Sequence, residues 1–130
     1  MSDLLKTMAS SVSGMAAQSA RLRLVSENIA NADTPGYRRK LVPFEQVLEG
    51  HGQAGAVRTG KMHLDTSELE SVFQPSHPMA DEDGYYQGSN VNLMLEIADA
   101  REAQRSYEAN LKMFDQARHM TSSLLELLRR

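Results

Sequence analysis

Two long segments of this 130-residue chain are almost free of glycine and proline, and this distribution constrains the fold more than any other feature. Eleven of the 12 glycine and proline residues lie between Pro35 and Gly88, and Gly14 is the exception. Because glycine and proline disfavour helix interiors, the chain divides into two helix-competent arms around a non-helical middle. We therefore expect one domain formed by the arms, with the middle as an appendage, divided as residues 1–34, 35–90 and 91–130.

The first arm, from about Asp3 to Asn31, has the hydrophobic pattern of a coiled-coil seam. Seam positions alternate four and three residues apart over four heptads, as is typical of coiled coils. They are Met1, Leu5, Met8, Val12, Met15, Ser19, Leu22, Ser26 and Ile29. Serines and flexible methionines occupy several of these positions, so the seam is weak.

The second arm, from about Val91 to Arg129, follows the same alternation. Its seam positions are Leu93, Ile97, Ala100, Gln104, Tyr107, Leu111, Phe114, Arg118, Thr121, Leu125 and Leu128. Asn90 or Asn92 can cap its first turn. Because both arms carry a seam of the same spacing, the two seams are natural partners for each other.

The middle segment is expected to be irregular with short strands. Met62–Asp65 and Leu69–Gln74 are short extended candidates, and Pro75–Pro78 reads as a turn. Asp83-Gly84 before Tyr85-Tyr86 is a hairpin signal.

None of the candidate motifs for catalysis, cofactor binding or metal binding is complete. Gly50–Gly55 fits G-x-G-x-x-G, but the residues after it do not start a helix, as a dinucleotide site requires. Gly55–Lys61 fits a phosphate loop, but Met62 follows where a magnesium-binding hydroxyl is needed. The chain has no cysteine, and no two of its four histidines share the i, i+4 spacing of a helical metal site. We therefore expect no enzyme, no cofactor and no metal.

Charge and hydropathy exclude two further classes of partner. The net charge of −3 leaves no electrostatic footprint for nucleic acid, and the basic cluster Arg38–Lys40 reads as a solvated face or a set of salt-bridge donors. No apolar run approaches the roughly 20 residues that span a bilayer, and the N-terminal residues are too polar for a cleaved signal peptide. We expect no nucleic-acid binding and no direct membrane insertion.

An asparagine-rich block ends the first arm. Asn28 and Asn31 lie three residues apart, where their amides can bond to backbone groups freed at the helix end. Asp33–Gly36 then imposes a turn, because proline fixes φ at one position and glycine supplies a positive φ at the next, as in a type II turn.

This block resembles the N-terminal signature of the flagellar rod, hook and hook-associated proteins of bacteria. Ten consecutive residues fit that signature, namely Asn28, Ile29, Ala30, Asn31, Ala32, Asp33, Thr34, Pro35, Gly36 and Tyr37. Two further stretches, His77–Tyr85 and Arg105–Asn110, are similar to the short, proximal-rod members of the C type. Asn90–Asn92 is similar to their helix entry, although Ser89 stands where proline is expected.

The resemblance implies a mainly α fold, with two long terminal helices packed as an antiparallel coiled-coil pair and an irregular middle containing short β-strands. It implies a structural subunit of the proximal rod, a tubular drive shaft that transmits torque and surrounds the export channel. The expected assembly interface consists of apolar seam residues, namely Leu5, Met8, Val12, Met15, Leu22, Ile29, Leu93, Ile97, Tyr107, Leu111, Phe114, Leu125 and Leu128.

The resemblance also implies partners and a location. The expected partners are copies of the chain, other flagellar rod proteins, basal-body adaptor and membrane-ring proteins, and the flagellar type III export apparatus. The expected location is the periplasm-spanning rod of the basal body, reached without a cleaved signal peptide. Two alternatives stay open: a soluble helical adaptor or export-chaperone-like binding module that stays in the cytosol, and another short rod paralogue.

Overall fold

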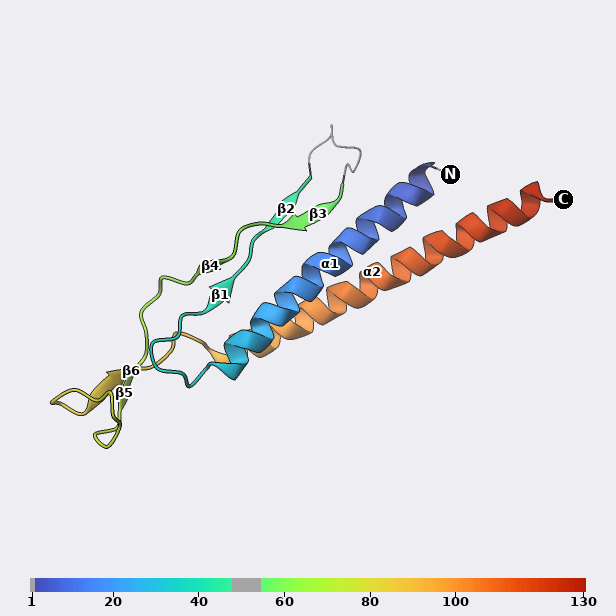
Figure 1. Ribbon diagram of the computed structural model, residues 1–130. Coiled ribbons are helices and arrows are strands. Elements are labelled where there is room, and N and C mark those ends of the chain that lie inside the picture. Colours follow the sequence, from blue (N-terminus) through green and yellow to red (C-terminus); the bar gives the residue numbers. More distant parts are fainter. Residues whose placement is uncertain (1, 48–54) are drawn as a thin grey trace.

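The computed structural model describes residues 2–47 and 55–130 and shows two long antiparallel helices flanked by a thin layer of short strands (Figure 1). The elements are α1 (Ser2–Ala30), β1 (Lys40–Leu41), β2 (Phe44–Gln46), β3 (Val57–Thr59), β4 (His63–Leu64), β5 (Ser71–Phe73), β6 (Tyr85–Gln87) and α2 (Leu93–Leu128). Both predicted arms are therefore confirmed to within two residues at each end. Met1 and most of the glycine-rich stretch Gly50–Gly55 lie outside the described residues.

The register of the helix pair is fixed at two places. A Cβ atom on Gly14 would lie 2.8 Å from Nδ2 of Asn110, and Nδ2 of Asn28 lies 3.4 Å from a carboxylate oxygen of Glu96. From the first place to the second, residue numbers rise by 14 in α1 and fall by 14 in α2. Continuing this pairing to the start of α1 puts Ser2 opposite residue 122. Residues 123–128 of α2 therefore extend past α1, as Figure 1 shows at the end marked C.

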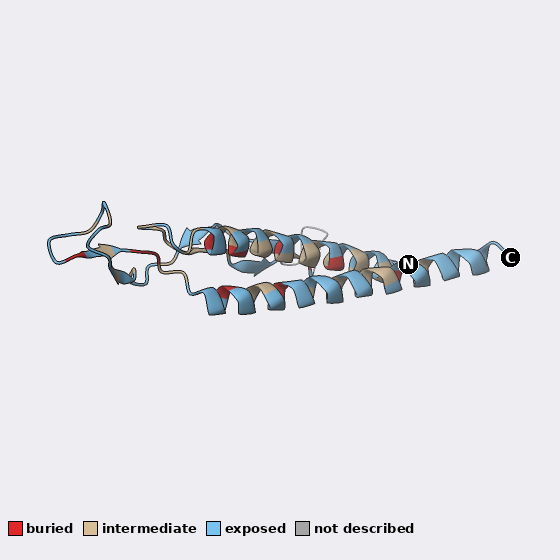
Figure 2. Cartoon of the chain, turned by 90° about the horizontal axis from the view of Figure 1, so that it is seen from below, coloured by how far each residue is buried: buried red, intermediate tan, exposed pale blue. Residues whose placement is uncertain are grey.

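The two helices meet through small and polar side chains. The buried residues are Ser11, Ala17, Val25 and Asn28 in α1 and Glu96, Ala103 and Ala117 in α2. Few residues of the described chain are buried, and they are scattered along the two helices and the middle segment (Figure 2). The expectation that the two apolar seams pack against each other is wrong.

The physical reason is a rotation of both helices by one position. Asn28 and Glu96 bond to each other in the interface, and burying such groups without partners costs far more than exposing apolar carbon. Most residues that directly follow buried residues of the helices are seam residues, as Ile29 follows Asn28 and Ile97 follows Glu96, whereas Ala17 is followed by Gln18. One position is a turn of about 100° around the helix, so the seams point away from the contact line.

The two antiparallel helices are related by an approximate two-fold axis perpendicular to the plane that contains both of them. A rotation of the same size and sense in each helix therefore turns both seams toward the same side of that plane. The strand layer lies against the other side of α1. Ser10 Oγ donates to the carbonyl of Gly55 (3.0 Å), and Ser13 Oγ accepts from the amide of Val57 (3.0 Å). The middle segment thus packs against α1, on the side away from its seam.

The strands form three two-stranded antiparallel pairs, β1–β4, β2–β3 and β5–β6. β4 and β5 lie within the two predicted extended stretches, and the predicted turn at Pro75–Pro78 is present. The β5–β6 hairpin projects beyond the end of the helix pair at which α1 ends and α2 begins (Figure 1), and Gly84, in the connection just before β6, has a φ of 86°. The division into one domain with an appendage stays a prediction.

Candidate functional site

Asn28 is the centre of a polar junction that joins both helices to the segment between them. Its side chain is 1% exposed and bonds in four directions. Its Oδ1 accepts from Tyr37 Oη (2.8 Å) and from the amide of Lys40 (2.9 Å). Its Nδ2 donates to the carbonyl of Lys40 (3.0 Å) and to Glu96 Oε2 (3.4 Å). The predicted role of Asn28 as a local helix-end cap is therefore wrong, because its amide bonds to residues distant in sequence.

A network of ion pairs surrounds the buried carboxylate of Glu96. Arg39 bonds to Glu96 through Nε and to Asp99 through Nη2, the second at 2.6 Å. Arg21 of α1 reaches the same Asp99 (3.2 Å) and, more distantly, Glu102 (3.5 Å). A buried carboxylate needs such a partner, because an isolated charge in a low-dielectric interior is strongly disfavoured. The network fixes the rotation of α2 against α1.

Asn31 has the local role that the sequence predicted. Its Nδ2 donates to the carbonyl of Glu27 (2.9 Å), and its Oδ1 accepts from Thr34 Oγ1 (3.1 Å), so both bonds stay within the end of the helix. Gly36 has a φ of 75°, as the predicted turn requires. Its amide then donates to the carbonyl of Gly88 (3.1 Å), which ties the turn to the segment before α2.

Asn90 and Asn92 divide the two tasks that the sequence left open. Asn92 is the N-cap of α2, and its side chain accepts from the amides of Met94 and Leu95. Asn90 instead accepts from the amide of Arg39 (2.6 Å) and donates to the carbonyl of Asp65 (3.1 Å). Asn90 therefore holds three separate parts of the middle segment together.

The basic cluster Arg38–Lys40 is a set of hydrogen-bond and ion-pair donors. Arg38 donates to the carbonyls of Asp65 (3.2 Å) and Ser67 (3.0 Å), and Lys40 pairs with Glu27. The hydrogen bond that Lys40 donates to Glu27 raises the pKa of Lys40. Burial, together with the charge of Glu27, raises the pKa of Tyr37. Hydrogen bonds from Ser67 lower the pKa of Asp65. The basic side chains of this cluster therefore bond to groups of the same chain.

A groove of about 350 Å³ lies beside the junction, with walls from Leu24 and Phe44 and a floor that includes Arg21, Glu96 and Asp99. The charged groups of this floor are paired with one another. Over residues 2–47 and 55–130, no three His, Asp or Glu side chains are placed to hold a metal ion. Within the same ranges, neither helix is long and apolar enough to cross a membrane.

The assembly interface predicted from the two seams stays a prediction, and we call its 13 residues the apolar face. They are Leu5, Met8, Val12, Met15, Leu22, Ile29, Leu93, Ile97, Tyr107, Leu111, Phe114, Leu125 and Leu128. None of them is buried, and Leu5 and Ile97 are 55% and 46% exposed. The structure thus leaves all 13 side chains at least partly accessible.

Comparison with known proteins identifies the family. Residues 8–38 match the model described as flagella basal body rod protein, and residues 82–127 match flagellar basal body rod FlgEFG protein C-terminal. Flagellar basal-body rod protein FlgC of Agrobacterium fabrum is 44% identical over 124 residues, which cover 90% of this chain and 89% of that protein. Proteins of the same name from Salmonella typhimurium and Bacillus subtilis are 35% and 34% identical, over 88% and 90% of this chain and 90% and 93% of theirs. The chain belongs to the flagellar basal-body rod protein family.

The two matched ranges of this rod-family chain contain the two sides of the junction. Asn28 and Tyr37 lie in the first range, and Glu96 lies in the second. Most of the strand layer, from β1 to β5, lies between the ranges. The junction is therefore built by the family's terminal segments, which the residues of β1 complete.

Sequence reasoning missed three members of the junction: Arg21, Asn90 as a bridge, and Glu96. One signal for Glu96 was present, because it is a lone carboxylate among apolar residues in the first turn of α2, between Leu95 and Ile97. No comparable signal marked Arg21, which lies among other charged and polar residues of the first arm.

Proposed function

We propose that this chain is a structural subunit of the proximal rod of the bacterial flagellar basal body, and that it assembles through its apolar face. The observation that carries this proposal is an excess of exposed surface. The chain exposes 9369 Å² of accessible area. A compact monomer of 14.4 kDa is expected to expose about 6,800 Å². The difference is about 2,500 Å² on one molecule, which is the scale of an obligate interface.

The chemistry of that surface supports association with similar helices. Stripes of large apolar side chains from α1 and α2 lie on one face, and contiguous apolar patches of this size mark interaction sites on soluble proteins. Helix pairs of this kind bury such stripes against one another by side-by-side packing. Neighbours related by a rotation that does not close would form a helical tube. Copies of the chain and other rod-family proteins therefore fit this surface.

The remaining parts of the proposal concern transport and mechanics. In the tube, the helices would transmit torque as a passive shaft around an export channel, and the strand layer would face away from the apolar contacts. Adaptor and membrane-ring proteins would meet the ends and outside of this shaft. The chain would reach the periplasm unfolded, through the flagellar type III export apparatus and without a cleaved signal peptide. The weak contact between α1 and α2, in which Gln18 Oε1 is buried without a hydrogen bond, supports easy unfolding for export.

A matched pair of charge substitutions tests the proposal. Ile97→Glu places one negative charge on the apolar face, and Gln116→Glu places one on an exposed position of α2 away from it. Because both side chains are exposed, each change is expected to alter the free energy of unfolding by about 0.5 kcal/mol or less. Ile97→Glu should abolish incorporation into isolated hook–basal bodies, and Gln116→Glu should not.

Two results would contradict the proposal. Normal incorporation and motility with Ile97→Glu would exclude the apolar face as the assembly surface. A chain that stays in the cytosolic fraction of flagellated cells, and never co-purifies with basal bodies, would favour the cytosolic adaptor instead.

A further inference from the structure

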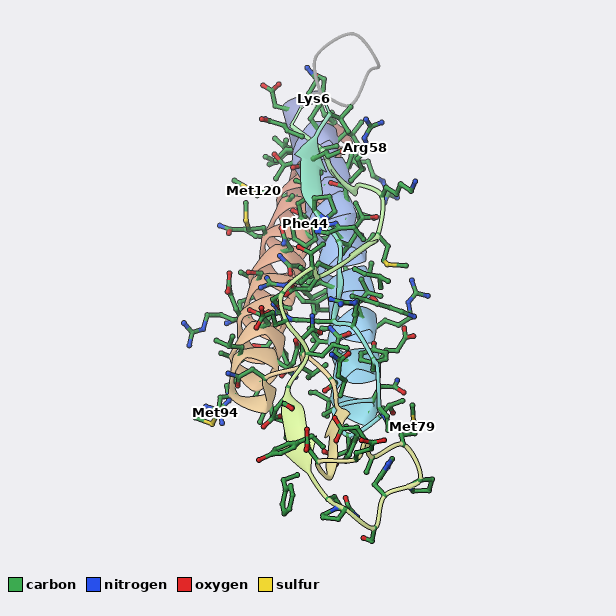
Figure 3. The ribbon with its side chains drawn as sticks, turned by 90° about the vertical axis from the view of Figure 1, so that its left-hand side faces the viewer. Lys6, Phe44, Arg58, Met79, Met94 and Met120 are labelled. Atoms are coloured by element: carbon green, nitrogen blue, oxygen red, sulfur yellow. The ribbon has the colours of Figure 1, made fainter. Side chains whose placement is uncertain are left out.

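The two most exposed large apolar side chains of the described residues lie at opposite ends of one helix. Met94 in the first turn of α2 and Leu128 at its last position are each 79% exposed. Figure 3 shows Met94 pointing away from the body of the molecule at the junction end. Two exposed apolar ends on one axis can both be covered if molecules stack end to end.

The far end of α2 is apolar and then basic. Residues 123–128 have no part of α1 opposite them, and four leucines there are exposed, namely Leu124, Leu125, Leu127 and Leu128. Arg129 and Arg130 follow, both exposed, and Glu126 is the only acidic side chain among residues 123–130. We call residues 123–130 the overhang. The formal charge of its side chains is +1, from two arginines and one glutamate.

The junction end offers a groove with the opposite chemistry. An open groove of about 520 Å³ lies where the loop after α1 meets the start of α2. Its acidic lining residues are Asp33, Glu68 and Glu70, and no lysine or arginine lines it. Its apolar lining residues include Val91, Leu93 and Met94. We call this surface the acidic groove.

These two ends match in the order of their chemistry. Leucines of the overhang can cover the exposed side chains of Leu93 and Met94, which removes apolar surface of both molecules from water. The arginines that follow can then reach the carboxylates of the acidic groove, and planar guanidinium groups bind carboxylates well. None of these three carboxylates has an ion-pair partner among the pairs formed by the described residues.

We propose that the overhang of one molecule docks in the acidic groove of a second copy. The contact joins two different surfaces, so it is heterologous, and repetition extends a stack instead of closing a dimer. This inference rests on the proposed function. It adds to that function an axial contact, which uses Leu93, Leu125 and Leu128 of the apolar face together with the charged residues of the two ends.

Cysteine pairing tests the contact directly, because the natural chain contains no cysteine. Purified Leu128→Cys is mixed with purified Glu70→Cys under oxidising conditions. The control pair is Leu128→Cys with Glu82→Cys, which places an equally exposed thiol outside the groove. A disulfide needs Cα atoms within about 7 Å, so only a docked pair forms it efficiently. We expect at least a tenfold higher yield of mixed dimer for Glu70→Cys than for the control, and equal yields or no mixed dimer overturn the proposal.

Charge reversal separates the ionic part of the contact. Arg130→Glu, added to Leu128→Cys, should lower the yield about fivefold. Glu68→Arg, added to Glu70→Cys, should restore it, because the reversed charges again match. Raising the salt concentration to 0.5 M should weaken cross-linking of the natural charge pair, since exposed ion pairs are screened. If neither charge reversal nor added salt alters the yield of mixed dimer, docking in the acidic groove is contradicted.

Basal bodies distinguish failure of this inference from failure of the proposed function. A chain carrying both Leu128→Cys and Glu70→Cys should yield disulfide-linked oligomers of itself in isolated basal bodies. If the chain is present there but is linked only to a different protein, or not linked at all, the axial contact between copies is wrong and the rod function stands. If the chain is absent from basal bodies, the rod function itself is wrong.

Discussion

Removal of the Asn28 side chain tests whether the polar junction holds the helix pair together. Asn28→Ala deletes three hydrogen bonds of 2.8–3.0 Å, to Tyr37 and to both backbone groups of Lys40, and a longer one to Glu96. A hydrogen bond contributes about 1 kcal/mol net, so we expect a loss of about 3 kcal/mol in the free energy of unfolding. That loss is roughly a 150-fold change in the folding equilibrium.

The assay is urea unfolding of the purified chain, followed by the far-ultraviolet circular dichroism of its helices. With a slope of about 1.5 kcal/mol per molar urea, the midpoint should fall by about 2 M. Asn31→Ala is the matched control, because it removes the same side chain three residues further along. The bonds of Asn31 stay within the helix end, so its loss should cost less than about 1 kcal/mol.

The comparison between the two asparagines decides the interpretation. Equal losses would mean that both residues only end the helix. A loss below about 1 kcal/mol for Asn28→Ala would mean that the junction does not determine the stability of the fold, and the explanation given for the helix rotation would then be wrong.

Three further changes probe the same structure. Glu96→Gln should cost about 2 kcal/mol in urea unfolding, because it removes one of the two carboxylates that pair with the Arg39 guanidinium, and Asp99 remains. Gly14→Leu should cost about 1–3 kcal/mol in the same measurement, since even a Cβ there lies 2.8 Å from the opposing asparagine. The pKa values of Tyr37 and Lys40 are raised above their ordinary values of 10.0 and 10.5, so the folded state holds both protons more tightly. Their stabilisation is present below about pH 10 and is lost as the pH rises through the folded pKa values. Unfolding midpoints measured between pH 8 and pH 11 should fall, and Glu27→Gln should flatten that fall.

Local signals in the sequence were sufficient for the elements of the fold. The distribution of glycine and proline separated α1 and α2 from the middle, and an asparagine at the predicted position caps α2. The turn at Gly36 followed from the φ values that proline and glycine favour. Each of these features depends on residues close together in the chain, so local chemistry determines them.

The rotation of the helices could not be predicted in this way. It depends on Asn28, Arg39 and Glu96, which lie far apart in the sequence and interact only once the chain has folded. Hydrophobic periodicity shows which side of a helix is apolar. It does not show whether that side faces the same chain or another molecule. The seam residues are largely exposed and do not form the core of the helix pair, and their role in assembly stays a prediction.

The polar and apolar surfaces of the helices have different roles, and this difference connects folding to assembly. Polar contacts fix how the helices of one molecule meet, and most large apolar side chains are left for neighbours. A partner that binds only the folded chain stabilises it by RT ln(1 + [L]/Kd), which is about 2.7 kcal/mol at 100 times Kd. This is close to the expected cost of Asn28→Ala. A chain with a weakened junction can therefore be unstable alone and folded in a rod, whereas a chain with a charged apolar face is stable alone and excluded from it.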